Sequence, residues 1–341
     1  MYYVLDVENS KWNYYLNKMP LNHRDIYFTS EYYKLCELNG DGIGKLFVYF
    51  DKDKIATYPF LMNQIEGYAL NDKYYDIQTA YGYGGPATNC HEEKFLSDFE
   101  SCFIDYCKEN NIVAEFIRFH PLIKNEKIFK ENIEILHNRR TIYLDLKKDL
   151  DSIWNNDITS KNRNMIRKAE KSGLQVNRSS KYEIFKEIYE DTMDKVGANK
   201  YYYFKDEYYN ELSRNNNCIL MNVEKDELVI ASAIFMVYGD YFHYHLSGSR
   251  KDYLKYAPNN ILLWEAIKIA RNYGCKYFHF GGGLADTEDD NLFKFKRSFS
   301  KNTSDFYIGK RVHNPKIYNY LIYEWEKKNN KKATLLLQYR Y

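Results

Sequence analysis

Two stretches of this chain repeat one order of secondary-structure elements, and this repetition constrains the fold more than any other feature. In the first stretch, β-rich segments at 45–50 and 55–62 flank the polar tetrapeptide Asp51-Lys52-Asp53-Lys54, which has the length of a hairpin loop. A helical pattern follows at 92–109, where apolar residues recur at helix spacing, and a strand at 112–119 closes the unit.

The second half repeats this order. Strands are expected at 219–223, 228–237 and 241–246, a helix at 258–273 and a strand at 276–280. The helix has Pro258 at its start and Gly274 after its end, which is the usual placement of these residues. Antiparallel hairpins followed by a helix and a strand predict mixed sheets flanked by helices, not a doubly wound parallel sheet.

We therefore expect an α/β (α+β) protein with two tandem domains, 1–147 and 148–341, each a mixed, largely antiparallel sheet flanked by helices. Between the repeated units lie a charged helical region at 150–172, ended by Gly173, and a short strand at 174–178. A further helical region follows at 182–196. An amphipathic helix at 314–329 is expected to pack across the second sheet.

Charge and cysteine content exclude several classes of protein. The 49 Lys and Arg residues nearly balance the 47 Asp and Glu residues, so the chain lacks the global basic field of a general nucleic-acid coat protein. Its six cysteines are scattered, without a C-x-x-C pair, which favours reduced thiols in the cytoplasm. No apolar run approaches the ~18 residues of a membrane span, so we expect a cytoplasmic protein with no transmembrane segment and at most peripheral membrane contact.

A strongly basic segment at 160–173 is the most informative stretch for function. On a helix, Arg163 and Arg167 lie four residues apart and share a face, with Asn164 and Lys168 beside them. Two guanidinium groups so placed repel each other unless an anion lies between them, and phosphate accepts such donors well. The alternative is a solvated basic helix face.

Three further short motifs follow the same order as the repeated units. They are Gly82-Tyr83-Gly84-Gly85-Pro86 in the first half, Gly281-Gly282-Gly283 after the last core strand, and Phe295-Lys296-Arg297-Ser298-Phe299 beyond it. A glycine triplet by itself marks only a bend or a close approach of the backbone. Here the glycines would also expose amide N–H groups to a carbonyl oxygen or a phosphate.

Taken together, these motifs resemble those of the FemABX transferases and related GNAT-like acyltransferases. The basic segment is similar to the Arg-Asn-x-Ile-x-Lys-Ala stretch that precedes a glycine in that family, and residues 295–299 are similar to its Phe-Lys-x-x-Phe motif. The resemblance implies two tandem GNAT-like domains, with the donor site in the second. It also implies transfer of an amino acid from aminoacyl-tRNA to a peptidoglycan precursor.

The resemblance places Lys296 near the reacting donor, as the catalytic residue. Its expected role is electrostatic, either holding a donor phosphate or balancing the tetrahedral oxyanion, with Lys294 and Arg297 widening the basic patch. The substrate-binding residues expected with it are Arg163, Arg167, Lys168, Gly84, Gly281, Gly282, Gly283 and Phe295. Tyr81 and Tyr83 are also expected there, and their rings could line a sugar or peptide groove. No tightly bound cofactor is expected. The acceptor would be a peptidoglycan or glycan precursor.

The donor is open between two kinds of molecule. Acetyl-CoA enzymes of the GNAT fold usually carry an Arg/Gln-x-x-Gly-x-Gly/Ala loop that holds pyrophosphate through backbone amides. Residues 250–258 occupy that place without the glycines, which favours aminoacyl-tRNA and its acceptor end as the partner, although Arg250, Lys251 and Lys255 could hold phosphate by charge. An acyl-CoA-dependent enzyme acting on an amino sugar of a surface polysaccharide is the alternative, and a non-catalytic nucleotide-glycan or RNA-binding module is a third.

Three histidines offer a competing interpretation. His243 and His245 would share one strand face and His279 would lie on the neighbouring strand, so three imidazoles could ligate zinc. No carboxylate or cysteine joins them at a recognised metal spacing, and their aromatic neighbours favour a buried, hydrogen-bonded role. We therefore expect no metal. No Gly-x-Ser-x-Gly segment occurs, which argues against a serine hydrolase.

Overall fold

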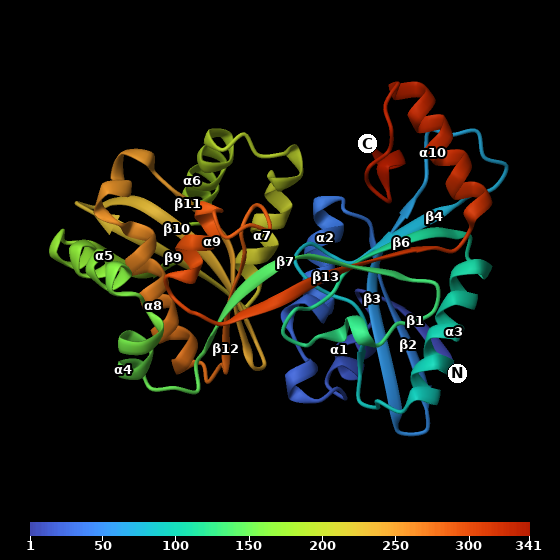
Figure 1. Cartoon of the computed structure of the whole chain (residues 1–341), viewed down its shortest axis with the longest axis horizontal. Coiled ribbons are helices and arrows are strands. Elements are labelled where there is room, and N and C mark those ends of the chain that lie inside the picture. Colours follow the sequence, from blue (N-terminus) through green and yellow to red (C-terminus); the bar gives the residue numbers. More distant parts are fainter. The chain divides into compact units, whose positions relative to one another are not determined.

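The computed structural model describes residues 1–341, which form two compact units. Unit 1 contains Met1–Asn138 and Phe306–Tyr341, and unit 2 contains Arg139–Asp305. The division falls inside two strands, β7 (Glu134–Asp145) and β13 (Thr303–Val312) (Figure 1). The units differ from the expected halves in giving the C-terminal segment to the first. The domain boundary after residue 147 stays a prediction.

Within unit 1 the strands follow the order β1-β2-β3-β4-β6-β13, and β5 pairs with β3. Their bounds are β1 (Tyr2–Asp6), β2 (Ile43–Asp51), β3 (Lys54–Gln64), β4 (Tyr75–Gln78), β5 (Ala87–Thr88) and β6 (Ile112–Arg118). Only β4 and β6 run parallel, and all other neighbouring strands are antiparallel. The antiparallel pair β2 and β3 forms the predicted hairpin. The predicted hairpin and closing strand of the first half are therefore correct.

Helices cover both faces of the unit 1 sheet. They are α1 (Lys11–Leu16), α2 (Ser30–Asn39), α3 (Glu93–Glu109) and α10 (Pro315–Asn329). An aromatic core lies under α3, where Phe99 and Phe103 pack against Phe47 and Tyr58 of the sheet. A separate apolar cluster joins α10 to β6 through Leu321, Val113 and Ala114. The prediction that the terminal helix packs across the second sheet is therefore wrong, because its apolar stripe is buried on unit 1.

Within unit 2 the strands follow the order β7-β12-β11-β10-β9-β8. Their bounds are β8 (Gln175–Ser179), β9 (Cys218–Lys225), β10 (Leu228–Tyr238), β11 (Tyr241–Ser249) and β12 (Tyr277–Gly282). Only β11 and β12 are parallel. Consecutive parallel strands need a crossover connection, and here a helix provides it. The predicted mixed and largely antiparallel sheet is confirmed.

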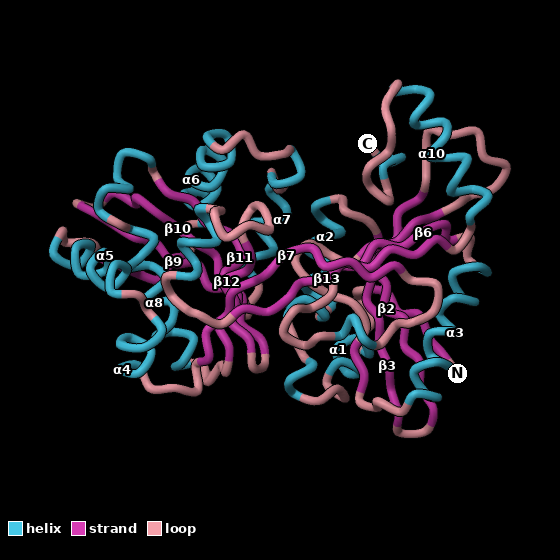
Figure 2. Tube along the Cα trace, in the orientation of Figure 1, coloured by secondary structure: helices cyan, strands magenta, loops and turns pink.

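Helices also cover both faces of the unit 2 sheet (Figure 2). They are α4 (Leu150–Ser152), α5 (Ser160–Lys171), α6 (Tyr182–Lys195), α7 (Asp206–Arg214), α8 (Pro258–Asn272) and α9 (Asn291–Arg297). The main core lies between the sheet and α5 and α8, and it contains Ile166, Leu262 and Phe278. On the other face, Phe185 of α6 and Tyr209 of α7 pack together as aromatic neighbours.

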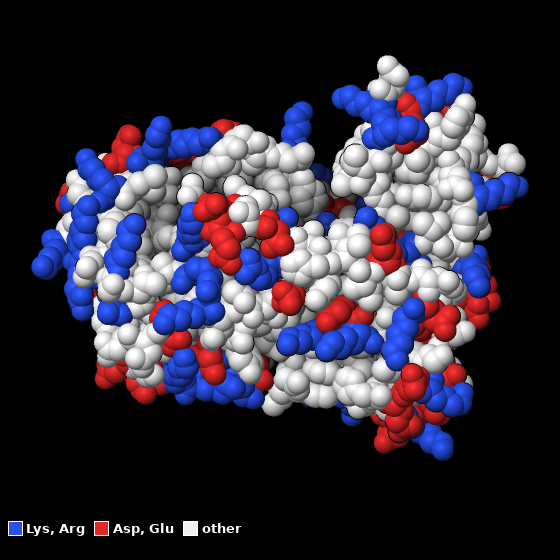
Figure 3. Space-filling view, in the orientation of Figure 1, with Lys and Arg blue, Asp and Glu red and all other residues white.

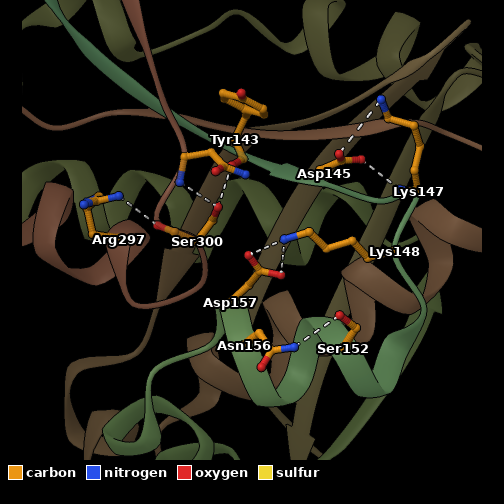
Figure 4. Close-up of polar contacts among 10 residues, drawn as sticks. Tyr143, Asp145, Lys147, Lys148, Ser152, Asn156, Asp157, Arg297 and Ser300 are labelled. Carbon is orange, nitrogen blue, oxygen red and sulfur yellow. Dashed lines mark hydrogen bonds and ion pairs between the residues drawn. The ribbon is translucent and has the colours of Figure 1, made fainter.

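The helical region expected at 150–172 is interrupted. After α4 the backbone forms a π-helical turn at Ile153–Asp157, and Ile158 and Thr159 are extended before α5 begins. The Thr159 side chain caps α5 by accepting from the Asn162 amide, and Lys148 Nζ pairs with Asp157 at 2.8 Å (Figure 4). The break orients the basic segment as a short helix of its own. No helix anywhere in the chain combines the length and apolar character needed to cross a membrane.

Candidate functional site

The parallel strands β11 and β12 pair only over their first three residues. Tyr241, Phe242 and His243 oppose Tyr277, Phe278 and His279, and the register ends at the two histidines. Beyond that point β11 continues to Ser249 against β10, and β12 continues to Gly282 against β7. The two strands therefore separate in the middle of the sheet, where backbone N–H and C=O groups on their facing edges need other partners.

Irregularities in both strands accompany this split. The β12–β7 register shifts between His279 and Gly281, and Gly281 has φ +77°, a conformation that favours glycine. The β10–β11 register shifts between Ile234 and Phe235, so β11 carries an extra residue. A Cβ on Gly282 would lie 3.0 Å from the Arg140 carbonyl oxygen, so this glycine is required by close approach of β7. The glycine motif thus shapes the end of β12.

Lys296 extends from α9 to the open end of this split. Its Nζ donates to the carbonyl oxygen of Gly282 at 2.6 Å and lies 6.0 Å from the ring centroid of Tyr244, the first β11 residue beyond the paired segment. The side chain is buried, with 8% of its surface exposed. The structure therefore brings Lys296 and the glycine triplet together, as the sequence predicted.

The ammonium group of Lys296 lies in a medium that disfavours charge. Burial lowers the pKa of Lys296 from 10.5 to about 7, an effect that Asp290 partly opposes and Arg139 reinforces. A lysine with such a pKa exists in both protonation states near neutral pH, so it can supply a proton or a positive charge where a reaction develops negative charge.

Asp290 organises the segment between β12 and α9. Its carboxylate caps α9 by accepting from Phe293 N at 2.7 Å, and it also accepts from the amides of Leu284 and Ala285. These bonds lower the pKa of Asp290 against the effect of burial. A Cβ on Gly283 would lie 2.4 Å from an Asp290 carboxylate oxygen, so the third glycine leaves room for this cap.

Basic side chains hold the acidic part of that segment. Arg139 Nη1 donates to the carbonyls of Gly283 and Leu284, Arg140 pairs with Glu288 at 2.7 Å, and Lys294 pairs with Asp289 at 2.9 Å. Figure 3 shows this group as red atoms bordered by blue on the face of unit 2. The expected widening of the patch by Lys294 is therefore offset by an acidic partner.

Tyr244 and Ser247 of β11 were missed by sequence reasoning. The Tyr244 hydroxyl donates to Ser247 Oγ at 2.7 Å, and burial raises the pKa of Tyr244 to about 12, so the phenol stays protonated. Both side chains lie on the part of β11 that has separated from β12. Only the position of that split could have indicated them, and it cannot be read from residue types.

The basic segment and the Phe-Lys-x-x-Phe motif meet through Asn162. Its Nδ2 donates to the Ser298 carbonyl at 3.2 Å, Thr159 N donates to the same oxygen at 2.9 Å, and Asn260 Nδ2 donates to Asn162 Oδ1. Asn162 is buried. The start of α5 therefore anchors the end of α9, which carries Lys296.

The arginines of α5 have structural contacts of their own. Arg163 Nη1 donates to the carbonyls of Trp154, Asn155 and Ile158, the last at 2.6 Å. The Arg167 guanidinium lies 5.3 Å from the Trp154 ring and donates to Asn164 Oδ1, while Lys168 is exposed. Backbone carbonyls receive the Arg163 guanidinium, and an aromatic ring and an amide oxygen receive that of Arg167. Their substrate-binding role stays a prediction.

Phe295 and Arg297 support α9 from either side of Lys296. Phe295 packs against the main core and meets Phe299 edge to face at 5.6 Å. Arg297 Nη1 donates to the Ser300 carbonyl, and Ser300 Oγ donates to the Tyr143 carbonyl of β7 at 2.7 Å (Figure 4). Both residues hold the helix in place, so the substrate contact expected of Phe295 stays a prediction.

Tyr81, Tyr83 and Gly84 belong to unit 1, whereas the other expected site residues belong to unit 2. The Tyr81 carbonyl accepts from Tyr32 Oη, and the Tyr83 ring meets Tyr27 and His120 edge to face. The Gly84 carbonyl accepts from Asn125 Nδ2 at 2.8 Å. The Tyr83 ring packs within unit 1, and the proposed sugar or peptide groove stays a prediction.

The three histidines do not form the zinc site considered from sequence. His243 and His279 meet edge to face at 5.4 Å between ring centroids, whereas His245 Nε2 lies 2.9 Å from Tyr208 Oη on α7. Burial lowers the pKa of His245 to about 3, so it is neutral near pH 7. For His245 the geometry supports the hydrogen-bonded role.

A metal-like grouping that sequence reasoning missed lies in the core of unit 1. Ligand atoms of Cys107, Glu115 and His313 are within 4.8 Å of one another. His313 Nε2 is 2.8 Å from Glu115, however, and the Arg311 guanidinium lies 3.6 Å from the same carboxylate. Because a buried guanidinium repels a metal cation, these residues form a charge network and do not suit an ion.

A surface pocket of about 480 Å³ lies at the end of β11, lined by Asp191, Lys195, Leu228, Arg250, Lys251, Asp252 and Tyr253. It includes two of the three cations considered as phosphate holders. Arg250, however, pairs with Glu187 at 2.8 Å and donates to the Val229 carbonyl. Lys255 lies 5.2 Å from the Tyr256 ring. Lys251 is the cation of this group with neither kind of contact.

Part of this chain is similar in sequence to known proteins. Residues 160–297 match the family described as "Acetyltransferase (GNAT) domain". Over 93 residues the chain is 30% identical to the lipid II:glycine glycyltransferase of Staphylococcus epidermidis, which covers 25% of this chain and 22% of that protein. The chain thus spans about a fifth of the length of the curated relatives it matches.

Solved structures share the fold over nearly the whole chain. FemX superposes with a TM-score of 0.69 at 14% identity, covering 93% of this chain and 99% of that one. A tandem GNAT protein from the clavulanic acid biosynthesis pathway superposes with a TM-score of 0.53 at 6% identity, covering 92% and 99%. At these identities the likeness establishes the fold, and the expected tandem GNAT-like architecture is confirmed.

Proposed function

We propose that the chain is an N-acyltransferase of the FemABX-like GNAT kind that forms an amide bond on an amine of a cell-envelope precursor. The single observation that carries this proposal is the buried Lys296 at the point where β11 and β12 separate. A split between parallel strands leaves backbone N–H and C=O groups that can bind an acyl donor, and the lysine supplies charge next to it.

The acceptor we propose is a peptidoglycan precursor. The matched relative acts, by its name, on lipid II and glycine, which supports an amino acid as the transferred group. That relative is matched over 22% of its length. A cytoplasmic precursor would meet the enzyme without any need for a membrane-spanning helix.

The donor we propose is aminoacyl-tRNA. The loop before α8 lacks the glycines that would present successive amides to a pyrophosphate, and instead forms a 3₁₀ turn at Lys251–Tyr256. In the reaction, the acceptor amine attacks the acyl carbonyl carbon and the ester bond to the tRNA ribose breaks. The proton that the amine loses balances the one that the ribose oxygen gains as it leaves as a hydroxyl. Lys296 in its ammonium form would stabilise the oxyanion or the leaving hydroxyl, and Tyr244 and Ser247 would border the acyl group.

A second donor is favoured by the family description. The matched GNAT domain is described as an acetyltransferase, and acyl-CoA is the co-substrate such a domain suggests. Lys251 and Tyr253 line the pocket at the end of β11, where a phosphate and an adenine ring would find a free cation and an aromatic surface. An acyl-CoA enzyme acting on an amino sugar would use the same strand split and the same lysine.

One experiment separates these proposals. The purified chain is offered aminoacyl-tRNAs and acyl-CoAs, each with lipid-linked and nucleotide-linked peptidoglycan precursors and with amino sugars, and mass spectrometry reads the increment on the acceptor. We expect an amino-acid increment from aminoacyl-tRNA that Lys296→Ala abolishes. Lys294→Ala is the matched control, since Lys294 lies on the same helix but is exposed and paired with Asp289. A folded wild-type protein that modifies no acceptor with any donor would refute the enzyme.

A further inference from the structure

The end of α10 in unit 1 carries an unusual density of positive charge. Lys327, Lys328, Lys331 and Lys332 are all exposed within six residues. Only Lys332 has an acidic partner, Glu326 at 2.8 Å, and its side chain is 89% exposed. By contrast, Lys94 on α3 pairs with Asp98 one turn away. Lys327, Lys328 and Lys331 are therefore left without an acidic partner of this kind.

Apolar side chains are exposed in the same segment. After α10 the chain folds back, because Ala333 N donates to Glu326 Oε1 at 2.9 Å and Trp325 Nε1 donates to the Tyr341 carbonyl. Of three consecutive leucines, Leu337 is buried and Leu336 packs on the α10 cluster, but Leu335 is 56% exposed. Tyr323 and Tyr341 are also exposed, at 61% and 71%.

Lysines beside exposed Leu and Tyr side chains are a combination that suits one kind of partner. Ammonium groups bind lipid phosphates, while leucine and tyrosine enter the boundary between headgroups and acyl chains. We propose that the C-terminal elbow, residues 323–341, docks on an anionic lipid surface. Figure 3 shows its lysines gathered over the end of α10.

A second basic surface, on α5, differs from the C-terminal elbow in its apolar side chains. On α5 of unit 2, Lys161, Lys168 and Lys171 are exposed and have no acidic partner, but the helix exposes no large apolar side chain. Such a surface offers charge alone, which a nucleic-acid backbone can use but an interfacial anchor cannot. The elbow differs by adding Leu335 and the tyrosines, and this addition is why we assign it to lipid.

Vesicle binding tests the proposal without any donor or acceptor, so its result is independent of the proposed transfer reaction. The full chain is sedimented with vesicles of phosphatidylcholine alone or mixed with phosphatidylglycerol. We expect binding only to the mixed vesicles, weaker at high salt. Replacing the four lysines by Gln should lower the partition coefficient at least about tenfold, and Leu335→Ser should lower it several-fold.

The α5 variant with Lys161, Lys168 and Lys171 replaced by Gln is the matched control and should keep wild-type vesicle binding. Circular dichroism verifies that each variant is folded. The proposal is overturned if the wild type ignores anionic vesicles, or if both lysine variants lose binding equally. It is likewise overturned if the elbow lysines are needed to bind RNA but not vesicles, because the partner would then be a nucleic acid.

Discussion

The Nζ atom of Lys296 lies 2.6 Å from the carbonyl oxygen of Gly282, so a buried cation on α9 is held by the last residue of β12. This bond satisfies one of three ammonium hydrogens and leaves the side chain beside the split between β11 and β12. A charge held this way is costly to the folded state, and such a cost is typical of functional positions.

Replacing Lys296 by Met should stabilise the protein while abolishing transfer. The pKa of Lys296 falls from 10.5 to about 7 on folding through burial, which corresponds to a penalty on the order of a few kcal/mol at pH 7. Removing the hydrogen bond to Gly282 destabilises the variant by about 1 to 3 kcal/mol, which offsets part of the stability gained when the buried charge is removed. We expect the free energy of unfolding, measured by urea denaturation at pH 7, to rise by about 1 to 2 kcal/mol.

The stability difference between Lys296→Met and wild type should also depend on pH. Between pH 7 and 10.5 the unfolded chain binds the proton that folded Lys296 has lost, so wild-type stability contributed by this group rises with pH across that window. The advantage of Lys296→Met should therefore shrink from pH 7 towards pH 10. Lys294→Met, at an exposed site, should show neither effect. A Lys296→Met protein less stable than wild type at pH 7 would contradict the assignment.

Transfer should depend on the protonated form of Lys296. If the ammonium stabilises the oxyanion, wild-type kcat/KM falls as pH rises above about 7, once the rising fraction of free acceptor amine is measured separately and divided out. Lys296→Arg keeps its charge, so its lower activity should lack this decline. A wild-type profile that instead rises through pH 7 would make neutral Lys296 a proton acceptor.

Much of the fold could be predicted because local patterns and tertiary packing agree. The hairpin of β2 and β3 follows from two β-rich runs around a polar loop, and α8 from its apolar spacing between Pro258 and Gly274. The terminal helix was assigned to the wrong sheet for a physical reason. Its apolar stripe, with Leu321 and Trp325, specifies burial but not the surface that buries it.

The candidate site divides in the same way. Lys296 and the glycine triplet could be found because motif order brought them together, and the contact between Lys296 and Gly282 confirms their proximity. The role of Arg163 could not be predicted from its charge, because it donates to a carbonyl just after a π-helical turn. No residue pattern in the sequence predicts that turn. Tyr244 becomes visible only when the strand pairing is known.

Arg163 should matter more for stability than for substrate binding. Its guanidinium donates to three backbone carbonyls of the turn before α5, so Arg163→Ala leaves carbonyls without partners and should cost about 2 to 3 kcal/mol. Lys168→Ala, on the exposed face of the same helix, should change stability by less than about 0.5 kcal/mol. Urea denaturation followed by Trp154 fluorescence measures both. If Arg163→Ala left stability unchanged and raised only the donor KM, the result would contradict the structural role and support the anion-binding role predicted from the sequence.

The buried charge network of unit 1 should be its most sensitive feature. Arg311 pairs with Glu100 and Glu115 while all three side chains are almost fully buried, and His313 Nε2 donates to the Glu115 carboxylate at 2.8 Å. Burial alone would raise the pKa of Glu115, but Arg311 and the contact with His313 together lower it. The carboxylate is therefore ionised in the folded state and depends on Arg311 for compensation.

Arg311→Met should destabilise unit 1 by about 3 to 5 kcal/mol, because it leaves two buried carboxylates without their cation. Glu115 contributes stability above its unfolded pKa, and that contribution is lost as pH falls through the lower folded value, so acid should narrow the gap between wild type and variant. Fluorescence of Trp12 and Trp325 reports on unit 1, and that of Trp154 and Trp264 on unit 2. Adding Glu115→Gln to Arg311→Met should restore part of the stability, since one uncompensated charge is removed. Were the single variant as stable as wild type, the network would contribute no net energy and its charges would have to be neutralised by protonation.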